Sequence, residues 1–313
     1  MSERSRRFPR PLLAVGVVLL LAAVTAWFLM APRRLPASEL ARAHTPNLAN
    51  GEVLFNAGNC SGCHQTPGQE DRQVLGGGLR LPTAFGTFVA PNISSDPAHG
   101  IGGWTEAEFL NATLRGVGRR GEHLYLAFPY STYSLLSTSD VRDLFAYLKT
   151  LPAATNPSAP HELSFPFNIR LTVGGWKLLY FKPKPFTPDP AKSAAWNRGA
   201  YLVEGPAHCG SCHTPHNALG GPTDDRYVGA PNLEKGGRFA TNITQHADGI
   251  GDWSEQEIAD LLKTGVDRCF NEPVGMRAVL ASTSRLPDAD IAAMASYLKT
   301  LPPRPGNAQR KSC

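Results

Sequence analysis

"CSGCH" at residues 60–64 and "CGSCH" at residues 209–213 decide how this chain folds. In each word two cysteines are separated by two residues, and a histidine follows the second cysteine directly. Thiols at this spacing on the first turn of a helix face the same way, and the next residue then points towards the centre of the group they hold. This is the attachment pattern for c-type haem, in which both thiols form thioethers and the histidine ligates the iron.

Two other uses of paired cysteines fit the sequence less well. A structural zinc site normally closes over short separations, whereas the two pairs here lie about 150 residues apart, each with its own histidine. A redox-active dithiol needs a βαβ setting, which the surroundings rich in Gly and Pro do not provide. We therefore expect two covalently bound haem c groups. Their attachment and iron-binding residues are Cys60, Cys63, His64, Cys209, Cys212 and His213.

The second half of the chain repeats the first at a shift of 149 or 150 residues. "GIGGWTEAEF" at 100–109 matches "GIGDWSEQEI" at 249–258, and "YLKTLP" recurs at 147–152 and 297–302. Each copy is of ordinary size for a small domain. The repeat predicts one module over residues 35–152 and a second over residues 196–303.

Local signals predict three helices in each module. Capping boxes formed by Thr105 with Glu108, and by Ser254 with Glu257, begin the middle helix of each copy. Gly51 and Gly199 are placed for close contact between helices. The predicted helices cover residues 47–59, 107–115, 139–150, 196–204, 256–264 and 288–300.

Residues 153–195 join the two modules. They are crowded with proline, which predicts a stiff, extended connector. Its central stretch, "FPFNIRLTVGGWKLLYF" at 165–181, is too apolar for a free linker, so we expect it to pack on a module or a partner. Residues 304–313 form a C-terminal tail.

The stretch "PLLAVGVVLLLAAVTAWFLM" at 11–30 has 20 residues without a charge, about the length that crosses a bilayer as a helix. The arginines that precede it, Arg4, Arg6, Arg7 and Arg10, favour the cytoplasmic side. A cleaved signal peptide is the alternative, with small residues at 24–26, but the apolar run continues beyond them to Met30. Residues 1–34 are therefore predicted to be a single-pass anchor in the bacterial inner membrane, with the rest of the chain in the periplasm.

The net charge of +5 lies entirely before residue 35, where six arginines face one glutamate. The predicted exported part is neutral, which argues against nucleic-acid binding. Haem propionates would make it mildly acidic and suit a partner with a basic docking patch. Cys269 and Cys313 remain outside the two words, and in an oxidising compartment they can pair with each other or stay as thiols.

Nearly the whole predicted exported chain resembles the di-haem and tri-haem cytochrome c subunits of membrane-bound bacterial dehydrogenases, such as those for alcohol and gluconate. The resemblance rests on both haem words, "FPFNIR", "HLYLAFPYSTY" at 122–133 and the two "YLKTLP" helices. It implies an all-α fold of two tandem class I cytochrome c modules that carry electrons from a dehydrogenase partner to quinone, a soluble cytochrome or an oxidase. The tri-haem form has one more module, which this chain lacks.

The resemblance also bears on the sixth ligand of each iron. Class I cytochromes place a thioether ahead of the last helix, where the second module has Met276. The family's word in the first module resembles "LYPAMPY", so Leu126 stands for its Pro and Phe128 for its Met. His123 is then one candidate ligand and an open or water-bound iron is another. The remaining candidates are Tyr125, Tyr130 and His99.

The function expected from these features is electron transfer without independent enzymatic activity, because no acid–base or nucleophile constellation is present. The alternative is a di-haem redox enzyme, either peroxidase-like or oxidising sulfur compounds, in which the first iron is open. A docking subunit without a redox role is a third reading.

Overall fold

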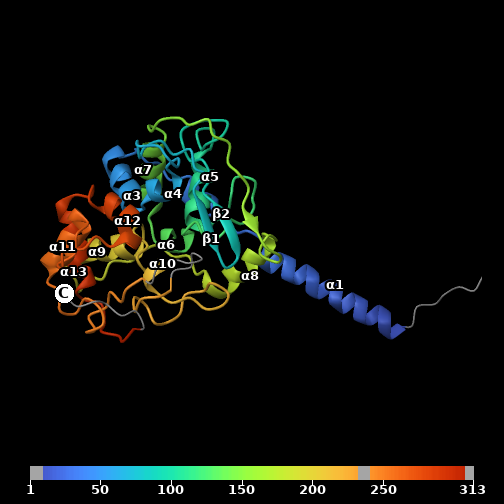
Figure 1. Ribbon diagram of the computed structural model, residues 1–313. Helices are drawn as coiled ribbons and strands as arrows, with labels where there is room; N and C mark the ends of the chain where they lie inside the picture. The colour runs from blue at the N-terminus through green and yellow to red at the C-terminus, as the bar shows by residue number, and fades with distance from the viewer. Residues whose placement is uncertain (1–9, 232–239, 307–313) are drawn as a thin grey trace, which may run out of the picture.

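Two helical modules and one long helix make up the computed structural model, which describes residues 10–231 and 240–306 (Figure 1). The long helix α1 (Arg10–Met30) projects from the body formed by the modules. Its stretch Leu13–Met30 is long and apolar enough to cross a membrane, and none of it is buried against the rest of the chain. Arg4, Arg6, Arg7 and Cys313 lie outside the described residues, as does most of the predicted tail.

The helices repeat between the modules as the sequence predicts. Module 1 contains α2 (Ala37–Leu40), α3 (Leu48–Ala57), α4 (Cys60–His64), α5 (Glu106–Arg115), α6 (Tyr130–Tyr133) and α7 (Thr138–Leu148). Module 2 contains α9 (Ala194–Glu204), α10 (Gly210–His213), α11 (Glu255–Thr264), η1 (Val274–Met276), α12 (Arg277–Thr283) and α13 (Asp288–Leu298). Both predicted capping boxes are present, at the starts of α5 and α11.

A glycine lets two helices cross closely in each module, as the sequence predicts. These are α3 and α7 in module 1, and α9 and α13 in module 2. A Cβ atom at Gly51 on α3 would clash with the carbonyl of Asp143 and would lie 2.7 Å from Cβ of Tyr147 on α7. At Gly199 on α9 it would clash with the carbonyl of Ala293 and lie 3.0 Å from Cβ of Tyr297. Only glycine permits this approach, so the same crossing supports each module's core.

Gly199→Ala should therefore destabilise module 2. The added methyl group meets backbone rather than a movable side chain, so the helices must separate, and we expect a loss of about 3 kcal/mol in the free energy of unfolding. Denaturant unfolding followed by far-ultraviolet circular dichroism measures this loss. Gly175→Ala on another helix is the control, because its Cβ would meet only Met30 Sδ, at 3.5 Å. Equal stabilities of the two variants would contradict the close crossing.

Within the described residues, three short strands qualify the all-α expectation. β1 (Arg80–Thr83) and β2 (Gly86–Val89) form an antiparallel hairpin, and β3 (Glu162–Leu163) pairs with β2 to complete the order β1-β2-β3. Gly86, with φ of 121°, supplies the backbone conformation that begins β2 after the turn. β3 comes from the connector, so this sheet joins segments that are far apart in the sequence.

The connector is also less extended than predicted, because its centre forms helix α8 (Leu171–Tyr180). Lys177 donates hydrogen bonds to the carbonyls of Arg115 (2.7 Å) and Gly116 (2.8 Å) at the C-terminus of α5, where a cation complements the helix dipole. On its other side α8 contacts α1 (Figure 1). The apolar centre packs on module 1 only in part: Val173 is buried and the ring of Phe181 meets that of Tyr130, whereas other large apolar side chains of this stretch remain exposed.

Asp143 ties the beginning of module 1 to α7. Its carboxylate accepts hydrogen bonds from the backbone N–H of Asn47 (2.7 Å) and from Nδ2 of Asn50 (2.8 Å), and it pairs with Nε2 of His44 at 2.6 Å. Burial by itself raises the pKa of Asp143, but the hydrogen bonds outweigh burial and the pKa is lowered. The charged form is therefore favoured in the folded chain.

Asp143→Asn should lower the free energy of unfolding by about 2 kcal/mol at neutral pH, because it removes charge-assisted hydrogen bonds from a buried site. A carboxyl whose pKa is lower in the folded state stabilises the fold above its unfolded pKa and loses that contribution as the pH falls through the folded pKa. The difference in the free energy of unfolding between wild type and variant should therefore become smaller below about pH 4. Unfolding curves from pH 7 to 3 test this, with the exposed Asp260→Asn as control. A difference that does not change with pH would contradict it.

Candidate haem-attachment sites

Each attachment motif begins at a sharp turn, which follows α3 in module 1 and α9 in module 2. Asn59 precedes Cys60 with φ of 48°, and His208 precedes Cys209 with φ of 39°. Non-glycine residues rarely adopt this left-handed conformation, and here it occurs at equivalent positions of the duplication. The turn separates α3 from α4 and α9 from α10, so each motif forms a short helix of its own.

The histidine of each motif is held by a backbone carbonyl. Nδ1 of His64 donates to the carbonyl of Pro91 (2.8 Å), and Nδ1 of His213 donates to that of Thr241 (2.6 Å). Burial lowers the pKa of both histidines, and the carbonyl bond only partly opposes it. The neutral imidazole then keeps its lone pair on Nε2, which is the form that ligates a metal.

The cysteines of the motifs are thiols rather than disulfides in this part of the chain. Burial, followed by the neighbouring Cys63 thiol, raises the pKa of Cys60 to about 12, and burial raises that of Cys209 to about 12 as well. Residues 10–231 and 240–306 contain no group of three or more His, Cys, Asp or Glu side chains that could hold a metal ion, so the structure does not support the zinc alternative. Two thiols beside an oriented imidazole fit haem c in both modules.

Met276 is half-buried at the end of η1 and packs against the core of module 2, as Cys209 does. Its backbone N–H donates to the carbonyl of Pro273 (2.8 Å), which closes the turn before α12. The structure thus brings Met276 and the attachment motif to one core. Ligation of the iron by its thioether remains a prediction.

Phe128 is the residue that stands for the family's methionine in module 1. It packs against the core to which Cys60 also belongs and lies two residues before the start of α6, whereas Met276 directly precedes α12. Its ring lies 5.5 Å from that of Tyr133, whose hydroxyl donates to the carbonyl of Gly58 (3.1 Å). Burial raises the pKa of Tyr133 well above its ordinary value, so this hydroxyl is neutral. A phenyl ring has no donor atom for iron.

The four other candidate ligands of the first iron all have protein contacts. His123 is buried with its Nε2 2.7 Å from the carbonyl of Met30 at the end of α1, and its Nδ1 is buried without a hydrogen-bond partner. Tyr125 lies beneath Arg170 at 4.5 Å, and Tyr130 meets the ring of Phe181 at 5.3 Å. His99 lies 3.3 Å from Asp96. Ligation by any of the four remains a prediction.

The two motifs lie close together across the interface between the modules. Helix α12 contacts α3 and α4, and Ser282 Oγ donates to Asn59 Oδ1 (2.8 Å), directly before Cys60. From the other module, the ring of His208 lies 6.0 Å from that of Tyr133. Sequence reasoning missed Asn59, His208 and Ser282, and only the matching positions of Asn59 and His208 before each motif could have indicated the first two.

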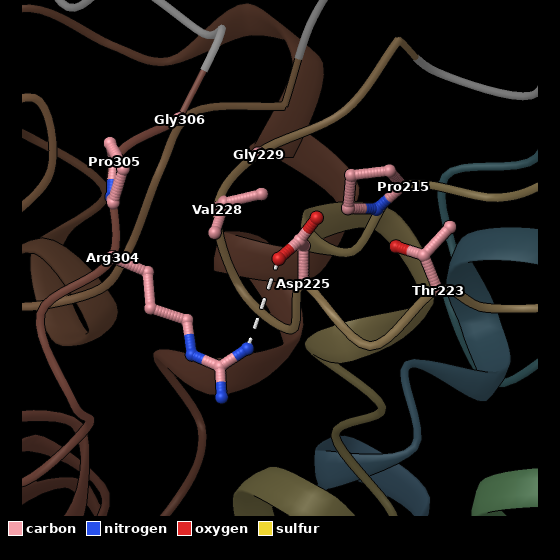
Figure 2. Close-up of a pocket in the computed structure, with 8 residues that line it drawn as sticks. All are labelled: Pro215, Thr223, Asp225, Val228, Gly229, Arg304, Pro305 and Gly306. Atoms are coloured by element: carbon pink, nitrogen blue, oxygen red, sulfur yellow. Dashed lines mark ion pairs between the residues drawn. The ribbon is translucent and has the colours of Figure 1, made fainter.

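A cavity of about 570 Å³ lies in module 2, and Figure 2 shows the residues that line it. Its walls come from the segment after His213 and from residues 304–306, and Arg304 lies 3.9 Å from Asp225 within it. The backbone N–H of Gly229, another wall residue, donates to the carbonyl of His213 (2.9 Å). The residues that line this cavity include neither cysteine of the second motif nor Met276. The cavity is therefore not the attachment site.

Comparisons with known proteins cover both modules. The family model for cytochrome c matches residues 48–152 and again residues 196–302. The chain is 43% identical over 292 residues to a protein of Cereibacter sphaeroides described as a diheme cytochrome c-type, covering 92% of this chain and 96% of that protein. It is 37% identical to the fructose dehydrogenase cytochrome subunit of Gluconobacter japonicus, covering 97% of this chain and 62% of that protein. It is 35% identical to the cytochrome c subunit of the quinone alcohol dehydrogenase of Gluconacetobacter polyoxogenes, covering 85% of this chain and 59% of that protein. The chain thus spans about three fifths of the length of these two dehydrogenase subunits.

Proposed function

Because this chain belongs to the cytochrome c family and carries two covalently bound haem c groups, we propose that it is a membrane-anchored periplasmic protein that transfers electrons from a dehydrogenase to the respiratory chain. When bound, haem c supplies an iron that gains and releases one electron. The observation that carries the proposal is the placement of two attachment motifs next to each other across one interface. The residues around the motifs hold and orient these groups.

The relatives support a dehydrogenase as the partner. Two of these are cytochrome subunits of fructose and alcohol dehydrogenases, which suggests a dehydrogenase as the electron donor here as well. A quinone, a soluble cytochrome or a terminal oxidase would accept the electrons. The unburied helix α1 suits an anchor that keeps the modules at the surface of the membrane.

Membranes prepared with and without this chain test the proposal. Alcohols, fructose and gluconate are added in turn, and the absorbance of reduced c-type haem is followed. We expect one substrate to reduce both haem groups only in membranes that contain the chain, and an added quinone or cytochrome to reoxidise them. Reduction by dithionite alone, with no response to any substrate of the tested classes, would contradict a dehydrogenase partner of these classes.

A second candidate function rests on Phe128. By resemblance Phe128 stands in place of the family's methionine, and its ring, which packs against the module 1 core, offers the first iron no donor atom. An iron with an open position binds small molecules, which suits a di-haem redox enzyme of the peroxidase-like or sulfur-oxidising kind. Carbon monoxide should then bind one haem group of the two in the reduced protein. Binding to neither group would rule this candidate out.

A further inference from the structure

The apolar part of the connector lies exposed beside the base of α1. Five of its large side chains face solvent, among them Phe165 with 78% and Leu179 with 61% of their surface exposed. We call them the apolar collar: Phe165, Phe167, Ile169, Leu178 and Leu179. Exposed apolar side chains concentrated in one short stretch indicate a surface that another phase or molecule covers.

The end of α1 is fixed on the same segment. A Cβ atom at Gly174 on α8 would clash with the carbonyl of Met30 and would lie 2.9 Å from the Cβ atom of Met30. The same carbonyl lies 2.7 Å from Nε2 of His123. The C-terminal end of α1 therefore packs closely on α8, and the two helices lie next to each other in Figure 1.

The length of α1 places the membrane surface at that position. Its 21 residues span about 31 Å at 1.5 Å per residue, and the hydrocarbon core of a bilayer is about 30 Å thick. The helix has no length to spare, so a bilayer that it crosses must extend to Met30. The contact between Met30 and α8 then puts the collar at the level of the lipid headgroups.

The charges around the collar fit a lipid surface. Between Leu163 and Pro188 the chain has four basic residues and no acidic residue. Lys182 and Lys184 follow α8 and are exposed, and Arg33 and Arg34 follow α1 and are exposed too. Apolar side chains flanked by cations are the combination that binds an anionic phospholipid surface.

We propose that the apolar collar inserts into the outer surface of the bilayer as a second membrane contact beside α1. The inference rests on the proposed anchoring by α1. Together the two contacts fix the orientation of the modules, because a single helix leaves them free to rotate about its axis. Module 1, which packs on α8, is thereby held next to the membrane.

Photolabelling of the full-length protein tests this contact. The chain is reconstituted in nanodiscs of phosphatidylethanolamine and phosphatidylglycerol that contain a phospholipid with a diazirine in its acyl chain, and labelled peptides are mapped by mass spectrometry. We expect labels in α1 and in residues 163–181. Phe165→Glu with Leu179→Glu should reduce labelling of residues 163–181 by roughly five- to tenfold, because both side chains leave the lipid, and should leave α1 labelled. Leu48→Glu, the same change at an exposed leucine of α3, is the control and should alter neither.

The outcomes separate this inference from the proposed anchor. Labels in α1 but not in residues 163–181 would overturn the collar and keep the anchor, and would point to a protein partner on this surface. Labels in residues 163–181 with α1 unlabelled would overturn the anchor and keep the collar. Labelling of residues 163–181 that the double variant does not reduce would also overturn the proposal.

Discussion

Replacing Cys209 and Cys212 together by serine should reduce the covalent haem content of the chain from two groups to one. The two thiols precede His213 on one short helix, and the structure offers no second cysteine pair beside that histidine within the described residues. Loss of both thioethers should also loosen module 2, since Cys209 packs against its core. A haem assay in alkaline pyridine, normalised to protein, gives the count.

The matched control for this change is Cys269→Ser. Cys269 belongs to the same module but is disulfide-bonded, so its replacement should leave both haem groups attached. Cys60→Ser with Cys63→Ser should likewise leave one group, now in module 2. Retention of two haem groups in either double variant would show that the assigned thiols do not hold them.

Phe128→Met should raise the reduction potential of the haem in module 1. The methionine would supply the thioether that the family resemblance leads us to expect at this position, and thioether ligation favours ferrous iron. Axial ligands move haem potentials over about 0.8 V in total, so we expect a rise on the order of 100 mV. Potentiometric titration gives the shift, and the near-infrared band of thioether-ligated ferric haem should gain intensity.

Phe128→Leu is the control, because it removes the ring without adding sulfur. It should leave the near-infrared band unchanged and shift the potential much less. Equal potentials in the Met and Leu variants would mean that residue 128 does not face the iron. The first iron would then take its sixth ligand elsewhere, and His123→Ala would be the next variant to titrate.

The parts of this account that the sequence predicted are those that local pattern determines. These local features are the two motifs, the repeat, the capping residues and the glycines at 51 and 199. Each depends on a few neighbouring residues or on one helix crossing. The capping boxes and the close crossings at both glycines are present in the structure where expected. The assignment of Met276, by contrast, used a resemblance and still awaits a test of ligation.

The parts that escaped prediction depend on long-range packing. β3 pairs with a hairpin more than 70 residues earlier, and Ser282 meets Asn59 across 223 residues of sequence. No periodicity in either segment indicates its partner. The position of His123 near Phe128 in the sequence makes it a candidate iron ligand. Its contact with the carbonyl of Met30 depends instead on where α1 ends against module 1, which the local sequence does not indicate.

The most direct test is whether the two haem groups differ in reduction potential. The measurement is a redox titration of the purified full-length protein, followed by absorbance and by electron paramagnetic resonance. The account predicts two one-electron steps at different potentials, of which the higher belongs to a histidine–methionine haem and disappears in Met276→Leu. A single step for both groups, or a higher step that survives Met276→Leu, would contradict it.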